Sequence, residues 1–374
     1  MKRILRFSTV LVTAFVLVSC GDKSASGFPD WALVGFQRPE GVNPIISPDT
    51  ASKFLCPMRE EMVGWEESDT FSPTAVSVDG KIVVLYRAED NSAKGIGSRT
   101  SRIGYAVSDD GFHFEKRSEP VLFPGGDDQT EYEIPGGCED PRVAVTEDGT
   151  YVLTYTQWNR SVARLAVATS RDLIHWEKHG PVFDESEGIV FDSVTRPGWT
   201  KSGSIVTKVD KGRQVIAKVN GKYLMYWGEK YVNLATSDDL IHWTPMLDEK
   251  GGLLQVLAPR EGYFDSVLTE CGPPAIITKK GILLMYNGKN ARGDAGDRDY
   301  PGSVYCGGQA LFDINDPTRL IGRLDKPFFF PEADFEKTGQ YSSGNVFLVG
   351  LVPHRKHWYL YYGCADSYSA VAVR

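Results

Sequence analysis

A motif that recurs along the chain limits the folds available to it. The segments "GYAVSDDGFHFEK" (104–116), "LAVATSRDLIHWEK" (165–178) and "NLATSDDLIHWTP" (233–245) each read as a strand, a tight turn with Asp, and a second strand. Such self-similarity indicates that one supersecondary unit is used several times. The repeats place His113, His175 and His242 at equivalent positions, so we expect three structural histidines on separate repeats and no metal triad.

A second repeated unit predicts how many sheets the chain forms. Five segments carry an apolar strand, a short turn, and a strand ending in Tyr and polar residues: "TAVSVDGKIVVLYRAED", "RVAVTEDGTYVLTYTQWN", "QVIAKVNGKYLMYWGEK", "AIITKKGILLMYNGKN" and "VFLVGLVPHRKHWYLYYGCAD". Their marker tyrosines are Tyr86, Tyr155, Tyr226, Tyr286 and Tyr361. Four-stranded sheets bury both faces when they pack radially. We therefore predict an all-β, five-bladed β-propeller of four-stranded antiparallel blades over residues 28–374, with no helix longer than a turn or two.

The first twenty residues, "MKRILRFSTVLVTAFVLVSC", resemble an export signal. A basic start, an apolar stretch and the ending "LVSC" predict a lipoprotein signal peptide over residues 1–19, lipid attachment at Cys20, and a flexible tether over 20–27. An ordinary secretory signal with a chance cysteine is the alternative. We expect an exported protein held to a membrane through Cys20, facing the periplasm or the cell surface, with no other bilayer-spanning segment.

Charge and cysteine content narrow the partners. Removing residues 1–19 takes the formal net charge from −8 to −11, which argues against nucleic acid as a partner. Five cysteines remain besides Cys20, without CxxC pairs, so the spacing does not indicate zinc, and we expect no metal or cofactor. These five leave room for one disulfide or for buried free thiols, which are the default. The sequence does not indicate an oligomeric state.

Polar residues gather at one end of the predicted strands. In a propeller blade, the start of the first strand and the end of the second lie at the same mouth. The residues at these positions are Glu139, Asp140, Arg142 and Glu270 at strand starts, and Arg87, Glu89, Asp90, Gln157, Asn159, Glu229, Lys230, Asn287 and Asp366 at strand ends. A carboxylate-rich funnel with Trp158, Trp199 and Trp227 nearby suits a sugar, since indole faces cover the C–H side of a pyranose ring. A solvated turn residue is the alternative for each lone acid, and a structural ion pair is the alternative for Arg87 with Glu89.

At this point the chain is similar to glycoside hydrolase family 130, the β-mannoside phosphorylases and β-mannosidases. The resemblance rests on "GGCEDPRV" (136–143), "YRAED" and "SRIGYAVSDDGFHF", and it extends from "GVNPIISPD" (41–49) to "YYGCAD" (361–366). It implies an inverting mechanism in which Asp140 donates a proton through the 3-hydroxyl of the bound mannose. Glu139 would raise the pKa of Asp140 and Arg142 would lower it, and the sequence does not decide between them.

The family divides by nucleophile. Where its phosphorylases often carry His in a "YHG" motif, this chain has Asn287 in "YNGKN", and Glu229 and Glu270 lie at neighbouring strand ends. Two carboxylates repel phosphate and can deprotonate a water, although Lys230, Lys289 and Arg292 could still supply positive charge.

We therefore expect an inverting, exo-acting β-mannosidase for β-1,2-linked mannosides, with Asp140, Glu229 and Glu270 as catalytic residues. The expected substrate-binding residues are Arg87, Glu89, Asp90, Glu139, Arg142, Gln157, Asn159, Asn287 and Asp366. The alternatives are a phosphate-dependent β-mannoside phosphorylase and a non-catalytic glycan-binding lipoprotein. The segment "GDAGDRDYPG" (293–302) reads either as a loop closing over the funnel or as a mobile excursion.

Overall fold

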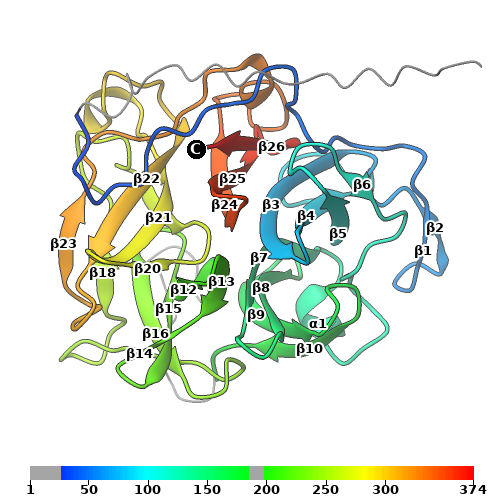
Figure 1. Ribbon diagram of the computed structural model, residues 1–374. Helices are drawn as coiled ribbons and strands as arrows, with labels where there is room; N and C mark the ends of the chain where they lie inside the picture. The colour runs from blue at the N-terminus through cyan, green and yellow to red at the C-terminus, as the bar shows by residue number, and fades with distance from the viewer. Residues whose placement is uncertain (1–26, 185–197) are drawn as a thin grey trace, which may run out of the picture.

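The computed structural model describes residues 27–184 and 198–374, and within them the chain is all-β (Figure 1). Its helical pieces are α1 (Thr130–Glu133), η2 (Gly293–Ala295) and η3 (Asp334–Glu336). This confirms the predicted class and the expectation that helices are short. No helix in these two stretches has the length and apolarity needed to cross a membrane. The predicted signal peptide and Cys20 lie outside the described residues.

Strands in the first half of the chain form one mixed sheet. It has eight strands in the order β10-β9-β8-β7-β5-β4-β3, with β6 beside β5. Two antiparallel groups are joined by a parallel bridge between Ser101 and Gly137. The bounds are β3 (Asp69–Val78), β4 (Lys81–Glu89), β5 (Ser101–Ser108), β6 (Glu115–Lys116), β7 (Gly137–Val145), β8 (Tyr151–Trp158), β9 (Ala163–Ser170) and β10 (Trp176–Pro181). A separate hairpin precedes them, formed by β1 (Phe54–Cys56) and β2 (Glu61–Val63).

Three further sheets follow. The six-stranded sheet contains β11 (Gly203–Ile205), β14 (Lys218–Val219), β15 (Lys222–Trp227), β16 (Val232–Ser237), β17 (Thr244–Pro245) and β18 (Gln255–Leu257). The seven-stranded sheet contains β12 (Thr207–Asp210), β13 (Arg213–Ile216), β19 (Leu268–Cys271), β20 (Ile276–Thr278), β21 (Gly281–Lys289), β22 (Tyr305–Phe312) and β23 (Leu320–Arg323). The last sheet contains β24 (Val346–His354), β25 (His357–Cys364) and β26 (Tyr368–Val373).

The first strands of these groups meet in the middle of the molecule (Figure 1). The Val143 amide in β7 donates to Thr74 Oγ1 in β3 at 3.0 Å, and Ser204 Oγ in β11 donates to the Pro273 carbonyl at 2.6 Å. Within the described residues, no hydrogen-bonded sheet closes on itself. Contacts between neighbouring groups therefore hold the inner strands together.

The third unit differs from the prediction. We expected "QVIAKVN" to form its first strand. Its last part does so, because β14 pairs with β15, but Arg213–Ile216 is β13, paired with β12 in a hairpin, and β11 pairs with the rest of β15. The reason is the turn at Lys211 and Gly212, both with positive φ, which is the conformation of a tight two-residue hairpin. The hairpin contacts β3, β7 and β24 around Ser77, Val145 and Val352, toward the C-terminal ends of these strands.

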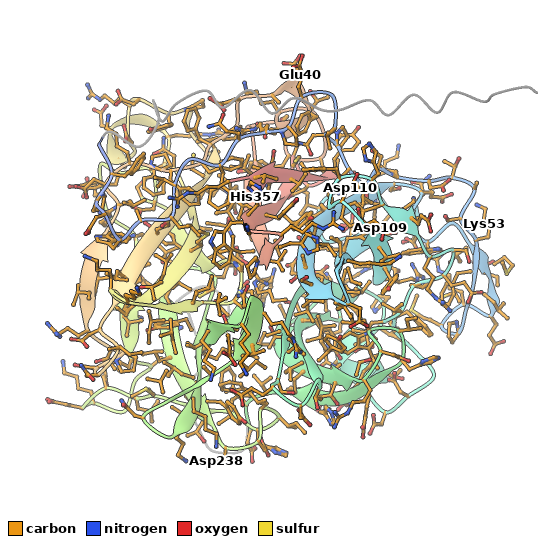
Figure 2. All side chains as sticks on the ribbon, viewed as in Figure 1. Glu40, Lys53, Asp109, Asp110, Asp238 and His357 are labelled. Atoms are coloured by element: carbon orange, nitrogen blue, oxygen red, sulfur yellow. The ribbon has the colours of Figure 1, made fainter. Side chains whose placement is uncertain are left out.

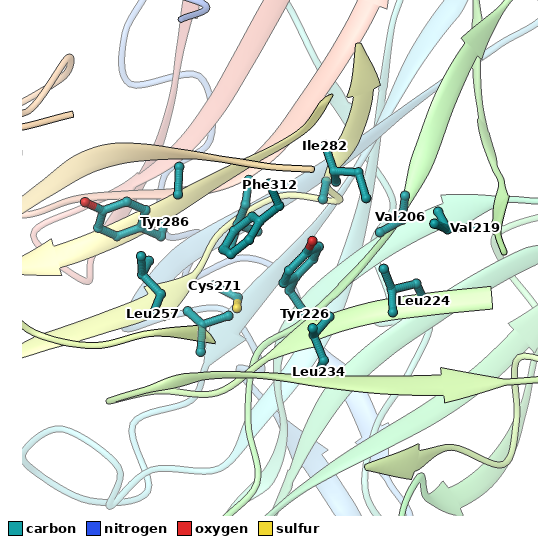
Figure 3. Close-up of a cluster of buried hydrophobic side chains, with 14 of the residues drawn as sticks. Val206, Val219, Leu224, Tyr226, Leu234, Leu257, Cys271, Ile282, Tyr286 and Phe312 are labelled. Carbon is teal, nitrogen blue, oxygen red and sulfur yellow. The ribbon is translucent and has the colours of Figure 1, made fainter. Parts of the chain in front are cut away.

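Marker tyrosines anchor the units in the buried core. In four units the tyrosine hydroxyl donates to a buried carboxylate, and that carboxylate is also bonded to a cation: Tyr86–Glu66–Lys116, Tyr155–Glu133–Lys178, Tyr286–Asp265–Arg323 and Tyr362–Glu336–Arg38. In the fifth unit the predicted marker, Tyr361, donates to the Gly111 carbonyl, and the next residue, Tyr362, makes the carboxylate contact. The third marker, Tyr226, packs on Phe312 at 4.7 Å and joins the third and fourth units (Figure 3).

The N-terminal segment completes the last sheet. Gln37 exchanges two backbone hydrogen bonds of 2.8 Å with Val373 in β26, and Arg38 binds Glu336 at 2.6 Å. Because β24–β26 has only three strands, this segment covers an otherwise open edge. In Figure 1 the blue segment runs beside the red C-terminal strands.

The repeated histidines and the cysteines are structural. In each Asp-containing turn the His Nδ1 lies 2.7–2.8 Å from the preceding Asp, as in His242 with Asp239, and the His side chain is exposed. Asp238, in one of these turns, lies at the edge of the molecule (Figure 2). The five described cysteines are free and buried, which confirms the prediction of free thiols.

Candidate active site

Two backbone bulges aim polar side chains into the middle of the molecule. Asp140 and Ser72 both have positive φ, 47° and 50°, and each precedes a proline at a register shift in its strand. A bulge bends the strand and turns a side chain that regular pleating would send elsewhere. At this point Ser72 Oγ donates to Asp140 Oδ1 at 3.1 Å. The "EDPR" motif therefore encodes a bend that points Asp140 inward.

A single guanidinium holds three carboxylates of the site. Arg87 Nη1 lies 3.1 Å from Asp140 Oδ1, while Nη2 lies 2.7 Å from both Glu89 Oε1 and Glu139 Oε1. All four side chains are buried. The sequence left open whether Arg87 forms a structural ion pair with Glu89 or contacts a ligand, and the structure shows the ion pair.

Two consecutive residues connect Asp140 with Glu270. Lys201 Nζ lies 3.1 Å from Asp140 Oδ2, and Ser202 Oγ donates to Glu270 Oε1 at 2.5 Å. The Arg142 side chain also joins β7 to β19, because it donates to the backbone carbonyls of Asp140 and Cys271. Asp140 and Glu270, which are far apart in sequence, therefore lie at one place.

Glu229 lies beside Glu270. The backbone on either side of each glutamate is joined, with the Thr269 amide bonded to the Lys230 carbonyl at 3.1 Å and the Cys271 amide bonded to the Gly228 carbonyl at 3.2 Å. Glu229 is partly exposed and lines a pocket together with Lys201, Trp199 and Tyr231. The three acids predicted as catalytic thus share one region.

Asp366 completes the group from the last sheet. Asn345 Nδ2 donates to Asp366 Oδ1 at 2.7 Å, and the charges of Arg87, Asp140 and Glu89 act on Asp366. We call Glu89, Glu139, Asp140, Glu270 and Asp366 the carboxylate cluster.

Electrostatics distinguish Asp140 from the other acids. Burial by itself would raise the pKa of Asp140, but the positive charges of Lys201, Arg87 and Arg142 outweigh burial and hold that pKa well below its usual range. The sequence left Glu139 and Arg142 as opposing influences, and the structure shows that the cations prevail. Asp140 is therefore ionised at neutral pH in the free protein.

Three members of the carboxylate cluster behave in the opposite way. Burial raises the pKa of Glu139, Glu270 and Asp366 to about 7 each, against the opposing charges of Arg87 or Lys201. Carboxyl groups with such pKa values exchange protons near neutral pH, as acid–base catalysis requires. Among the described residues, no cluster of His, Cys, Asp or Glu has the arrangement of a metal site.

Two further predicted residues serve the framework around the cluster. Asn287 uses its whole amide on the backbone of Leu348, with bonds of 3.1 and 2.7 Å that join β21 to β24. Arg142 bonds only backbone carbonyls in the contacts described above. Both lie next to the carboxylate cluster and fix its strands.

Three predicted binding residues lie apart from the carboxylate cluster. Asp90 is bonded to Arg102 at 3.0 Å and to the Ser92 amide. Gln157 donates to Glu133, and Asn159 Oδ1 accepts from the Ser161 and Val162 amides in a turn. Each of these contacts, like those of Asp90, joins residues of the same unit. Of the tryptophans, Trp227 is buried, while Trp158 and Trp199 pack edge to face at 5.4 Å.

Lys201 and Asn345 are site residues that the sequence reasoning missed. Asn345 directly precedes β24 and Lys201 lies two residues before β11, while Glu139 and Asp140 lie near the start of β7, so all four are at the beginnings of inner strands. The same positional rule would have found Lys201 if β11 had been recognised. Buried carboxylates, amides and cations gathered at one end of the inner strands of an all-β chain suit the binding of a carbohydrate.

Comparison with known proteins identifies the family. A family model for glycoside hydrolase family 130, described as β-1,4-mannooligosaccharide phosphorylase, matches residues 54–374. The chain belongs to this family, which confirms the resemblance.

Individual relatives agree with this assignment. The 1,2-β-oligomannan phosphorylase of Thermoanaerobacter sp. (strain X514) is 33% identical over 83% of this chain and 90% of its own. A solved structure from Bacteroides thetaiotaomicron VPI-5482 is 66% identical with a TM-score of 0.89, covering 93% of this chain and 99% of that one. Another is 57% identical with a TM-score of 0.88, covering 92% and 95%; it comes from work stating that this family of mannoside phosphorylases contains glycoside hydrolases that target β-1,2 mannosidic linkages in Candida mannan.

Proposed function

We propose that the protein is an inverting, exo-acting β-mannosidase for β-1,2-linked mannosides. The observation that carries the proposal is the contact of the adjacent residues Lys201 and Ser202 with Asp140 and Glu270. Because both acids contact one short segment, this contact supports an acid and a base that act around one position, as cleavage with inversion needs. The substrate is supported by the 57% identical structure, which comes from work on family members that target β-1,2 mannosidic linkages.

In this proposal, Glu270 and Glu229 bind a water and take its proton. Asp140 delivers a proton to the leaving oxygen through a sugar hydroxyl. Asp140 is ionised in the free protein, so it must gain its proton as the sugar binds. Glu139, which has a pKa of about 7 and is linked to Asp140 through Arg87, is the proposed donor. The sugar hydroxyls then face Arg87, Glu89 and Asp366.

Water rather than phosphate is the proposed nucleophile because the five acids of the carboxylate cluster outnumber the cations that are bonded to them. Arg87 and Lys201 are already bonded to its members, Arg142 to carbonyls, and Asn287 to Leu348. A phosphate dianion would meet the remaining negative charge in a buried site, at a cost of several kcal/mol.

A phosphorylase is the second candidate, favoured by the description of the family model and by the name of the 33% identical relative. The relatives reported above are named as enzymes or studied as such, and none supports a non-catalytic glycan-binding lipoprotein.

Incubation of β-1,2-mannobiose with and without phosphate separates the two candidates. Hydrolysis yields mannose in either condition, released first as the α-anomer, which proton NMR detects. Mannose 1-phosphate formed only with phosphate would reverse the choice. Glu270→Gln and Glu229→Gln should each slow hydrolysis without matching loss of binding, and normal rates in both would remove the water-activating role.

The architecture and location are part of the proposal. We propose five blades, supported by the five tyrosine-marked groups and the contacts among their inner strands, and export with lipidation at Cys20, supported by "LVSC". Labelling of cells with a tagged fatty acid should mark the wild-type chain and not Cys20→Ala. Equal labelling of both would remove the anchor.

A further inference from the structure

The segment 291–304 between β21 and β22 is a fixed structure. Asn290 is buried, and its Nδ2 donates to the carbonyls of Asp297, Tyr300 and Pro301 at 2.9–3.2 Å while its Oδ1 accepts from the Asp297 amide at 2.8 Å. One side chain thus ties both arms of the loop together. These hydrogen bonds hold "GDAGDRDYPG" in the position that the structure describes.

This loop supports two tyrosines. The Tyr341 hydroxyl donates to the Ser303 carbonyl at 2.6 Å, and the Tyr341 ring packs edge to face on Tyr305 with centroids 5.3 Å apart. Lys289 Nζ lies 5.0 Å and 5.3 Å from the two ring centroids. We call Tyr305 and Tyr341 the tyrosine wall, and both remain partly exposed.

Strand register places the wall beside the carboxylate cluster. Glu270 lies opposite Asn287, and two residues further along β21, Lys289 lies opposite both Leu268 and Tyr305. Directly opposed residues share a face, and so do residues two apart, so Tyr305 is on the face of Glu270, one step nearer the end of β21. The Tyr305 amide also bonds the Gly344 carbonyl, next to Asn345, which holds Asp366.

The charges around Tyr305 agree with this placement. Burial raises the pKa of Tyr305 well above its usual value, and the negative charges of Glu270 and Asp366 add to the effect. The hydroxyl is therefore in the field of the same acids that face the proposed reaction.

We propose that the tyrosine wall binds one pyranose ring of the mannoside, with the aromatic rings against its C–H face and the carboxylate cluster against its hydroxyls. This inference rests on the proposed function and adds a specificity element to the same site. Tyrosine presents a flat apolar face and a polar edge, which matches a neutral sugar. Asn290 and the loop act as positioning elements, because they hold Tyr341 through Ser303.

Kinetics of single variants on β-1,2-mannobiose test the wall. Tyr341→Ala and Tyr305→Ala should each raise KM roughly tenfold with kcat changed much less, since stacking acts on bound substrate and transition state alike. Tyr341→Phe keeps the ring and loses only the bond to Ser303, so its KM should rise less. Tyr341 is in a loop, so its variants provide the test if Tyr305→Ala does not fold.

The matched control is Tyr223→Ala. Tyr223 also has a lysine over its ring, with Lys218 Nζ at 4.7 Å. It lies near the start of β15, whereas Trp227, which lines the pocket, is at the other end of that strand. Its removal should leave KM unchanged. Calorimetric binding of the same disaccharide to Asp140→Asn, with and without Tyr341→Ala, should show the same tenfold weakening without turnover.

The outcomes separate this inference from the proposed function. If the unsubstituted protein cleaves mannobiose and both alanine variants keep its KM, the wall does not bind sugar and the function stands. If the unsubstituted protein neither cleaves nor binds the disaccharide, the function fails and the wall fails with it.

Discussion

Lys201→Met tests the electrostatic argument for the site most directly. Lys201 Nζ lies 3.1 Å from Asp140 Oδ2, and the charges of Glu270, Glu229 and Glu139 also act on it. At an effective dielectric constant of about 20, charges 3.1 Å apart attract by about 5 kcal/mol, which sets an upper limit of roughly 4 pKa units on the effect of removal.

The expected shift is smaller because Arg87 stays in place, also 3.1 Å from Asp140. We expect the pKa of Asp140 to rise by about 1–3 units. The pKa of Glu270 should rise too, since Lys201 lowers it against the effect of burial. The limb of the kcat/KM profile that reports Glu270 should then move to higher pH.

The assay is kcat/KM for β-1,2-mannobiose across pH 4–9, with circular dichroism to check the fold. Lys201→Arg keeps the charge and should leave the limbs near those of the wild type. Lys230→Met is the matched control, because Lys230 lines the same pocket, is exposed and lies over Tyr231. Limbs that stay in place in a folded Lys201→Met protein would refute the role assigned to this charge.

Three other changes probe the acid, the closure of the last sheet and a repeated turn. Asp140→Asn should lower turnover about 10²–10⁴-fold in the mannobiose assay, with circular dichroism to check that the variant is folded. Arg38→Met leaves Glu336 buried without its cation and should cost about 3 kcal/mol in urea unfolding, whereas Arg298→Met, in an exposed pair, should cost nothing measurable. Burial raises the pKa of Asp239, but the hydrogen bonds in its turn outweigh burial and hold that pKa low. The ionised carboxylate therefore stabilises the fold above about pH 4, and this contribution is lost as the pH falls further. Asp239→Asn should lower the free energy of unfolding at pH 7 and have less effect at pH 3.

Much of the architecture could be predicted because it is repeated. A tyrosine that ends each second strand is visible in sequence, and its partners explain why: Tyr86, for example, donates to buried Glu66 at 2.7 Å. The third unit could not be predicted in the same way. Its first strand, β11, is three residues long and is followed by the hairpin of β12 and β13. The apolar residues of β13 match the pattern expected of a first strand, so the sequence alone pointed to them.

The candidate site was predictable in position and less so in composition. Strand polarity shows which residues reach the mouth, but it does not show which face of the sheet they occupy. Gln157 lies opposite Cys138, and Thr156 lies opposite Glu139, so Gln157 points to the other face from Glu139. The inward direction of Asp140 depends on a bulge, which a motif suggests only through the proline that follows.

The protonation of the carboxylate cluster connects its charge to the choice of nucleophile. Three of its carboxyls have pKa values near 7, so the site takes up protons just below neutral pH and becomes less negative. A less negative site tolerates phosphate better, whereas water activation needs Glu270 without its proton. A hydrolase with this cluster should therefore lose activity as pH falls through about 7, unless phosphate is attacking, in which case activity should persist. The same mannobiose assay with phosphate, run at pH 5.5 and pH 7.5, distinguishes these responses, and persistent phosphate-dependent cleavage at the lower pH would overturn the argument for water.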